Sequence, residues 1–434
     1  MIRRVLCLAV LLVLVGAAPA AAHNVTAGAD LRIAQTIAGT ELTVVIKGTS
    51  RVPGPLQIGV IAYQPVTGLP VGLEIRSVED GRTVTGSATA AAEPRFTQLR
   101  VERTGPHELK LRAGDEVAVV PFRVLVERAS AGDFLIYGGL FLAGVLLVGG
   151  LLTGALSRPG PAMALAAGAA AGVTVAALVV VAEPILPPSP PDGAAPTAES
   201  TLPDGSAQAG GRPFAQGRVE TVPASPAAGA EFTLRLDLVD GSTGRPVDDL
   251  VAHHEALAHL VVTSEDGRFF RHLHPLRTGP GRLEVRLRAD RAGRYLAYAE
   301  LEREDSGGQL LTAAFSVTGD PSPAPVEEQQ VAGNAGTPAL RPAVPVAGRP
   351  ATIEVPAQGA VRPWLGMTGH LIVRSQDGAF LGHVHEMGTP GGRLRFTFSF
   401  PRPGRYLAWS QYAVSDKIVT VPFTVDVAAG EAAR

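Results

Sequence analysis

Short runs in which apolar and polar residues alternate fill most of the chain. Between residues 23 and 132 they include residues 42–46 and 116–120, and glycine and proline separate them. Alternation with a period of two is typical of strands that bury one face. Many short strands between turn residues indicate a β-sandwich. Because the same alternation of apolar and polar residues occurs in residues 214–320 and 341–429, the pattern predicts a mainly β protein with three sandwich domains.

Two long apolar stretches interrupt this alternation. Residues 134–156 and 162–182 contain no charged residue, and each stretch is long enough to cross a bilayer as a helix. We therefore expect transmembrane helices at 133–157 and 162–182, joined by a short cytoplasmic loop at 158–161. Arg158 in that loop agrees with the positive-inside rule. Both flanking regions, 23–132 and 183–429, would then lie on the extracytoplasmic side of the cell membrane.

The start of the chain is typical of a secretory signal peptide. Arg3 and Arg4 precede an apolar run, and small residues at 20–22 suit a cleavage site. We expect the signal to cover residues 1–22. The single cysteine, Cys7, lies inside it, so a metal site in the mature protein must use histidine, methionine or carboxylates.

Composition limits the remaining possibilities. The chain has 434 residues, with 38 basic and 40 acidic side chains. This length accommodates two to four domains, and the balanced charge gives no indication of nucleic-acid binding. Stretches rich in proline, alanine and glycine at 183–213 and 321–340 are expected to be linkers.

Histidines occur in two copies of one spacing. His259, His272 and His274 follow the pattern H-x12-H-x-H, and the pattern recurs 111 residues later. Residues 259–299 align with 370–410 without a gap, which indicates a duplicated domain. The second set is His370, His383 and His385.

Each histidine motif contains an Asp-Gly pair near its middle, at Asp266 and Asp377. Asp-Gly favours a two-residue type I′ hairpin turn. Such a turn would place His259 opposite His274, and His370 opposite His385. A four-residue loop that pairs His259 with His272 is the alternative. In either register the three imidazoles of a copy share one sheet face, within reach of one metal ion.

Three converging imidazoles point to a metal site, because imidazole is the commonest side-chain ligand for zinc and copper. The alternative is a polar ladder without metal. His254 is a candidate fourth ligand of the first site, and Glu255 either orients a ligand imidazole or is simply solvated. The second copy offers further candidates: Met367 and Met387 as ligands that favour copper, and Glu386 as an orienting carboxylate.

Several residues outside the two histidine motifs have a weaker link to a metal site. Cleavage after residue 22 would leave His23 at the mature N-terminus, where its α-amine and imidazole can chelate copper together; a frayed terminus is the alternative. The aromatic residues after each hairpin are expected in the core, with lining of the metal pocket as the alternative. They are Tyr295, Tyr298, Tyr406 and Trp409. We interpret His107 as structural.

The stretch from His254 to Pro275 resembles secreted bacterial proteins associated with heavy-metal and copper handling. Their pattern is H-E-x-x-x-H-L-x-V-x-S-x-D, then F-x-H-x-H-P, often with a second G-H-L…H-x-H copy that closes in V-P-F. Here the second copy runs from His370 to Phe423. The N-terminal region also resembles periplasmic copper chaperones of the CopC type. At the second site Glu386 replaces the proline, which weakens that match.

The resemblance covers roughly residues 250–427. It implies immunoglobulin-like or cupredoxin-like sandwiches and a metal-linked role outside the cytoplasm. It carries over a set of candidate ligands: His254, His259, His272, His274, His370, His383 and His385.

These observations predict a membrane-anchored extracytoplasmic protein that binds copper, with zinc as second choice, and hands it to a partner protein. An open site on a hairpin face would suit such exchange. The first alternative is a metal-independent sandwich protein for adhesion or envelope-complex assembly. A metalloenzyme is not expected, because the sequence offers no general base beyond Glu255 and Glu386.

Overall fold

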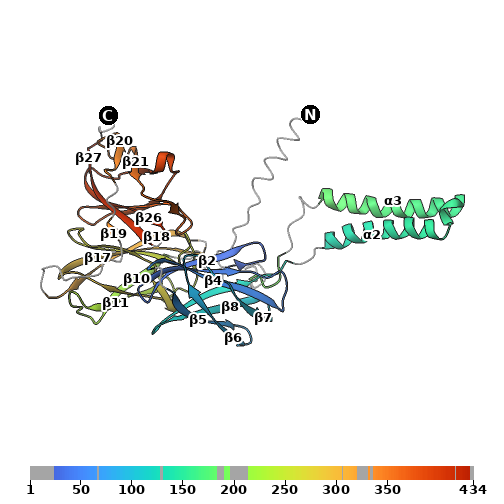
Figure 1. Ribbon diagram of the computed structural model, residues 1–434, viewed down its shortest axis with the longest axis horizontal. Helices are drawn as coiled ribbons and strands as arrows, with labels where there is room; N and C mark the ends of the chain where they lie inside the picture. Colours follow the sequence, from blue (N-terminus) through green and yellow to red (C-terminus); the bar gives the residue numbers. More distant parts are fainter. Residues whose placement is uncertain are drawn as a thin grey trace.

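The computed structural model describes residues 24–65, 68–127, 131–182, 190–195, 214–304, 306–319, 331–332, 336–415 and 417–430. The expected signal peptide and His23 lie outside these ranges. Three β-sandwiches form one body, and a helical hairpin projects from it (Figure 1). The predicted fold class, mainly β with an apolar helical hairpin, is confirmed.

The N-terminal sandwich packs two sheets, with strand orders β1-β9-β8-β5-β6 and β2-β3-β4-β7. Alternate residues face inward, as in Leu109 and Leu111 of β8, which are fully buried. The strands are β1 (Asn24–Val25), β2 (Asp30–Ile37), β3 (Thr40–Lys47), β4 (Gly54–Gln64), β5 (Leu69–Ser77), β6 (Thr83–Ala90), β7 (Thr97–Val101), β8 (Gly105–Ala113) and β9 (Glu116–Val124).

The first histidine-bearing copy packs the sheet β10-β11-β16-β15 against β12-β17-β13-β14, with β18 beside β17. The strands are β10 (Ala215–Val222), β11 (Glu231–Asp240), β12 (Leu250–Val251), β13 (Ala258–Ser264), β14 (Phe270–Leu273), β15 (Leu276–Gly279), β16 (Arg282–Arg288), β17 (Gly293–Arg303) and β18 (Gly307–Val317).

The second copy repeats this plan with the sheets β20-β21-β25 and β19-β27-β26-β23-β24, and β22 pairs with β26. The strands are β19 (Val331–Ala332), β20 (Ala339–Arg341), β21 (Pro350–Pro356), β22 (Val361–Arg362), β23 (His370–Ser375), β24 (Leu381–His385), β25 (Arg393–Ser399), β26 (Gly404–Val414) and β27 (Lys417–Val427).

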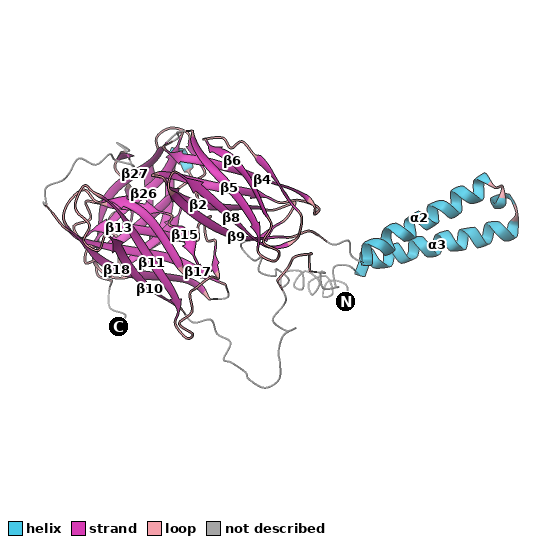
Figure 2. Cartoon of the chain, turned by 90° about the horizontal axis from the view of Figure 1, so that it is seen from below, coloured by secondary structure: helices cyan, strands magenta, loops and turns pink. Residues whose placement is uncertain are grey.

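Helices α2 (Ala131–Leu152) and α3 (Pro159–Ala182) form the hairpin, which stands apart from the β body (Figure 2). Both are long and apolar enough to cross a membrane. Phe141 and Leu152 are 75% and 81% exposed, so these helices do not form the core of a soluble domain. Their outward apolar side chains suit contact with lipid.

The helix ends differ from the sequence prediction of helices at 133–157 and 162–182 with a loop at 158–161. Helix α2 stops before Gly154, whose φ of +67° suits a helix terminus. A short 3-10 turn, Ala155–Ser157, follows, and α3 begins at Pro159, inside the expected loop. Proline is well tolerated in the first turn of a helix, where its missing N–H has no partner to lose.

The two histidine hairpins have the predicted register. Val261 lies opposite His272 in the first copy, and His370 lies opposite His385 in the second. The predicted type I′ turn is wrong, because Gly267 and Gly378 have positive φ while the aspartates before them do not. Four residues, 265–268, form the first loop, and Gly267 N donates to Ser264 O at its centre. This loop keeps the register because it is centred on the same Asp-Gly pair.

The two copies pack against each other through equivalent strand faces. Pairs of residues 111 positions apart form a shared apolar cluster, and Phe270 stacks on Trp409 with 4.6 Å between ring centroids. Because equivalent residues meet, the interface resembles that of a symmetric dimer within one chain. The pairs are Val261 with Ile372, Phe270 with Leu381, Leu296 with Leu407, and Tyr298 with Trp409.

The hairpin glycines belong to this interface. A Cβ at Gly267 would collide with the Leu407 side chain. We expect Gly267→Ala to lower the free energy of unfolding by about 1–3 kcal/mol more than Gly307→Ala. Gly307 has a similar φ of +70° but nothing within 4 Å of its would-be Cβ, so it controls for backbone strain alone. Chemical denaturation of the full chain checks this, and equal losses would contradict the packing.

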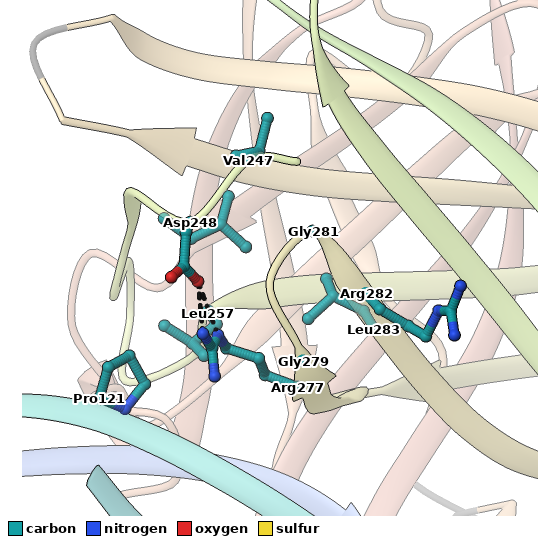
Figure 3. A pocket seen from close by; sticks show the side chains of 10 residues that line it. Pro121, Val247, Asp248, Leu257, Arg277, Gly279, Gly281, Arg282 and Leu283 are labelled. Atoms are coloured by element: carbon teal, nitrogen blue, oxygen red, sulfur yellow. Dashed lines mark hydrogen bonds and ion pairs between the residues drawn. The ribbon is translucent and has the colours of Figure 1, made fainter. Parts of the chain in front are cut away.

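The N-terminal sandwich covers one end of the paired copies. A second apolar cluster joins Ala34 and Tyr63 to Ala256 and Trp364, so it unites all three domains. At the other contact, Arg277 donates to Asp248 over 3.0 Å beside Pro121 of β9, around a small pocket (Figure 3). All three sandwiches therefore enclose the region between the hairpins.

Candidate metal centre

The first three histidines converge as the sequence predicts. His259 Nδ1 lies 3.2 Å from His272 Nε2 and 3.2 Å from His274 Nε2. All three rings are buried, with no more than 2% of each residue exposed. We call this set the first triad. Ligand nitrogens on a tetrahedral ion with bonds of about 2.0–2.1 Å lie about 3.3–3.4 Å apart, so the observed spacing is close to what an ion requires.

The tautomers of the first triad follow from the hydrogen-bond partners of its outer nitrogens, the ring nitrogens that point away from the other two histidines. His259 Nε2 lies 3.0 Å from the His253 carbonyl oxygen, and His272 Nδ1 lies 2.9 Å from Gln411 Oε1. His274 Nδ1 lies 2.6 Å from the Glu41 carboxylate. Each partner is an acceptor, so each outer nitrogen donates its proton. In the neutral rings the inner nitrogens then carry bare lone pairs that face one another, an arrangement that a cation stabilises.

The second triad consists of His370, His383 and His385, and it copies this geometry. His370 Nδ1 lies 3.2 Å from His383 Nε2. The outer nitrogen of His370 donates to the Trp364 carbonyl oxygen over 3.0 Å. His385 Nε2 is buried and has no hydrogen-bond partner. In both triads, the three ligand atoms lie within 4.8 Å of one another.

The two triads form one cluster, whereas the sequence treats them as two separate sites. The ring centroids of His272 and His383, equivalent residues of the two copies, are 5.1 Å apart. His259 and His383 are 5.2 Å apart. The histidines occupy the sheet faces turned away from each sandwich core, and the pairing of the copies brings those faces together. We call the result the six-histidine cluster.

Each copy supplies an acceptor to the other copy's triad. Glu300 of β17 lies 3.0 Å from His383 Nδ1, and Gln411 of β26 holds His272 in the same way. Glu300 and Gln411 are equivalent residues, 111 positions apart. Both therefore act across the interface, and each triad takes one of its hydrogen-bond acceptors from the other copy.

The N-terminal sandwich contributes the remaining acceptor. Thr36 N donates to the His274 carbonyl oxygen over 2.8 Å, and His274 N donates to Thr36 Oγ1 over 2.9 Å. Thr36 Oγ1 also donates to Glu41, which holds the His274 ring. The N-terminal sandwich therefore covers the first triad. The open hairpin-face site expected from the sequence is wrong, because a second and a third domain cover that face.

Burial sets the charge of the cluster. It lowers the pKa of His370 to about 3, with His385 as a further cause, and lowers that of His385 to about 4. Burial and neighbouring imidazoles hold the pKa of His259 and His272 well below the usual range. These rings are neutral at pH 7, which is the form that binds metal. Burial also raises the pKa of Glu300 to about 7.

The other candidate residues of the first copy lie elsewhere than predicted. His254, expected as a fourth ligand of the first triad, lies closer to the second: its ring centroid is 3.8 Å from that of His385 and 6.3 Å from that of His259. The Glu255 side chain is only 14% exposed and forms a salt bridge with Arg32 of the N-terminal sandwich. Its backbone carbonyl also accepts from Ala34 N.

In the second copy, Glu386 binds its own loop. It accepts from Thr368 Oγ1 and from Gly369 N, so it does not orient an imidazole as predicted. Met387 is 62% exposed, and Met367 closes a turn with Trp364 through backbone hydrogen bonds. The exposure of Met387 does not suit a ligand of the buried cluster, and Met367 as a ligand stays a prediction.

Two of the four aromatic residues that follow the hairpins pack as expected. Tyr295 and Tyr406 lie in the cores of their own sandwiches. Tyr298 and Trp409 lie instead in the interface between copies, where Tyr298 Oη donates to the Gly378 carbonyl oxygen over 2.7 Å. His107 is buried and contacts the Gly105 carbonyl oxygen in the N-terminal sandwich, away from the cluster.

Fold and site together define a class: a tandem of β-sandwiches that pair around a buried histidine cluster, next to an apolar helical hairpin. The sequence profile of a domain of unknown function, DUF8832, matches residues 216–320 and again residues 343–429. These are the two histidine-bearing copies. No curated protein matches the chain in sequence.

Several solved structures share weak similarity with the chain. A two-domain fibronectin type III segment of chicken tenascin is 13% identical, with 48% of this chain and 98% of that one covered and a TM-score of 0.17. The Escherichia coli adhesin FdeC is 12% identical, with 94% and 98% covered and a TM-score of 0.19. Invasin, a bacterial integrin-binding protein, is 11% identical, with 89% and 60% covered and a TM-score of 0.17. Similarities this weak do not identify a function.

Proposed function

We propose that this chain is a membrane-anchored extracytoplasmic protein that binds two metal ions, one in each histidine triad, and passes them to a partner protein. The observation that carries the proposal is the first triad. Its inner nitrogens converge: His259 Nδ1 lies 3.2 Å from those of His272 and His274. The outer nitrogens donate to a carbonyl, an amide and a carboxylate. Histidines that ligate metals donate their second N–H in this way.

Copper is the preferred ion, with zinc second. Imidazole suits both metals, but a given nitrogen site binds Cu²⁺ more tightly than Zn²⁺. Charge also favours monovalent copper. Each triad hydrogen-bonds one carboxylate, Glu41 in the first and Glu300 in the second. When both carboxyl groups are ionised, one copper(I) ion per triad balances the buried charge, whereas each zinc ion leaves an unbalanced positive charge, which is costly away from water.

The helical hairpin supports the membrane anchor, and Arg158 between its helices supports a cytoplasmic turn. Both β regions would then lie outside the cytoplasm. A binding protein is proposed rather than an enzyme, because the carboxylates nearest the rings are hydrogen-bonded to them and hold them in place.

The test measures metal in the full chain purified in detergent and loaded with copper(I) under reducing conditions. We expect two ions per chain, one after His272→Ala, one after His383→Ala and none after both. His107→Ala, which changes a histidine outside the cluster, should retain two. If the wild-type chain takes up no copper and no zinc, metal-independent adhesion or assembly becomes the better reading of the sandwiches.

A further inference from the structure

The two triads of the six-histidine cluster differ in how far solvent can reach them. His274 of the first triad is fully buried and bonded to Glu41. Its equivalent, His385, receives no such cover and is only partly buried. The second triad is therefore the side on which the cluster approaches solvent.

Two further histidines extend from His385 toward the surface. The His254 ring lies 3.8 Å from that of His385, and the His253 ring lies 3.8 Å from that of His254. The His253 side chain is 41% exposed, and its Nδ1 lies 3.2 Å from Glu302. Three imidazoles thus form a continuous row from solvent to the second triad.

Two nitrogens of this row have no hydrogen-bond partner in the structure. His254 Nδ1 and His385 Nε2 are both buried without a hydrogen-bond partner. A buried polar atom left in this state costs about 1–3 kcal/mol. The backbone adds strain, because His254 and Glu255 both have positive φ, 46° and 60°. The unpaired buried nitrogens therefore require an explanation, and a metal ion that they bind supplies one.

The duplication supplies an internal comparison. Leu365 occupies the place of His254 in the second copy, with nearly the same φ of 55°. It is completely buried in the apolar cluster that joins the three domains. The turn therefore accepts leucine without change of shape, so its conformation does not require a histidine. Only the first copy places an imidazole here, and that imidazole contacts the other copy's triad.

We propose that His253, His254 and His385 form an entrance relay through which metal ions reach the second triad before the first. The inference rests on the proposed metal-binding function and adds a route to it. An ion exchanges one imidazole nitrogen for the next along the row, and its oxidation state does not change. Glu302 beside His253 attracts the cation at the surface. His254 carries the ion inward but is not a ligand of the final site.

The test is the rate of copper(I) transfer from its coloured bicinchoninate complex to the full chain in detergent, followed by stopped-flow absorbance. We expect His254→Leu, the residue that the second copy uses, to slow transfer at least about tenfold. The variant should still take up two ions per chain at equilibrium. Met387→Leu, an exposed change near the second triad, should transfer at the wild-type rate.

The outcomes separate the two proposals. If the wild-type chain takes up no copper, the proposed function fails, and the relay fails with it. If His254→Leu takes up two ions at the wild-type rate, the relay alone is wrong. If that variant loses an ion at equilibrium, His254 is a permanent ligand, and the relay is again wrong. A normal denaturation midpoint for the metal-free variant shows that it folds.

Discussion

Loading both triads with copper is expected to raise the free energy of unfolding of the sandwiches by about 8 kcal/mol. The figure applies when free metal exceeds each dissociation constant a thousandfold, because each site then contributes about 4.1 kcal/mol. The effect is large because both triads form only in the folded chain, and each takes a hydrogen-bond acceptor from the other copy. Guanidinium denaturation of the full chain in detergent, with copper(I) or with a chelator, measures it.

The control is the double variant His272→Ala with His383→Ala. Its denaturation midpoint should be the same with copper and with chelator, since neither triad retains three ligands. If the denaturation midpoint of the wild-type chain is the same with copper as with chelator, the cluster does not bind the metal. A shift of equal size in the double variant would place the stabilising ions elsewhere.

The sequence predicts each hairpin well because the information is local. The Asp-Gly pair centres the loop, and the period of two then places His259, Val261 and Thr263 on one face of β13. The register survives the wrong turn type because it depends on where the loop is centred. It depends less on whether the loop has two residues or four.

The convergence of the triads is not local and could not be predicted in the same way. A duplication shows that both copies fold alike, but it does not show which faces meet. The sequence holds one signal: Leu260, Val261 and Val262 are consecutive, so β13 carries apolar side chains on both faces, as in a strand covered on two sides. Every residue of β13 is buried in the structure. Val261 and Ile372, on the histidine faces, form the contact between copies.

The sequence does not reveal the hydrogen-bond acceptors that orient the rings, for two reasons. Glu41 belongs to the N-terminal sandwich, 233 residues away from His274 in the sequence, and no motif links the two. Glu300 and Gln411 lie opposite His259 and His370 in their own copies, so their strand position could have drawn attention to them. Their partners, however, are in the other copy. Such contacts depend on domain packing, which residue spacing within one hairpin does not determine.

Acidification is expected to destabilise the metal-free protein as pH falls below about 6.5. An unfolded histidine has a pKa near 6.5, whereas burial lowers the folded pKa of His370 to about 3 and that of His385 to about 4. At a pH between the folded and the unfolded pKa, these histidines are protonated in the unfolded chain but neutral in the folded chain. Each such histidine therefore removes about 1.4 kcal/mol of stability per pH unit across its window.

Glu300 opposes this trend over part of the range. Its folded pKa is raised to about 7 from an ordinary 4.5, so its contribution to stability grows as pH falls from 7 to 4.5 and then stays constant. One carboxyl group offsets about one histidine, and burial lowers the pKa of His259, His272 and His383 as well. The net result is a loss of stability in acid.

Urea denaturation of the chelated full chain at several pH values between 7.5 and 4.5 measures this slope. The double variant His272→Ala with His383→Ala removes two of the low-pKa imidazoles, so its stability should fall less steeply than that of the wild-type chain. Equal slopes would mean that these rings are protonated in the folded state, and that the cluster is wetter than its burial indicates. In the loaded protein the same protons compete with copper for the inner nitrogens, so metal release should accompany the fall in stability.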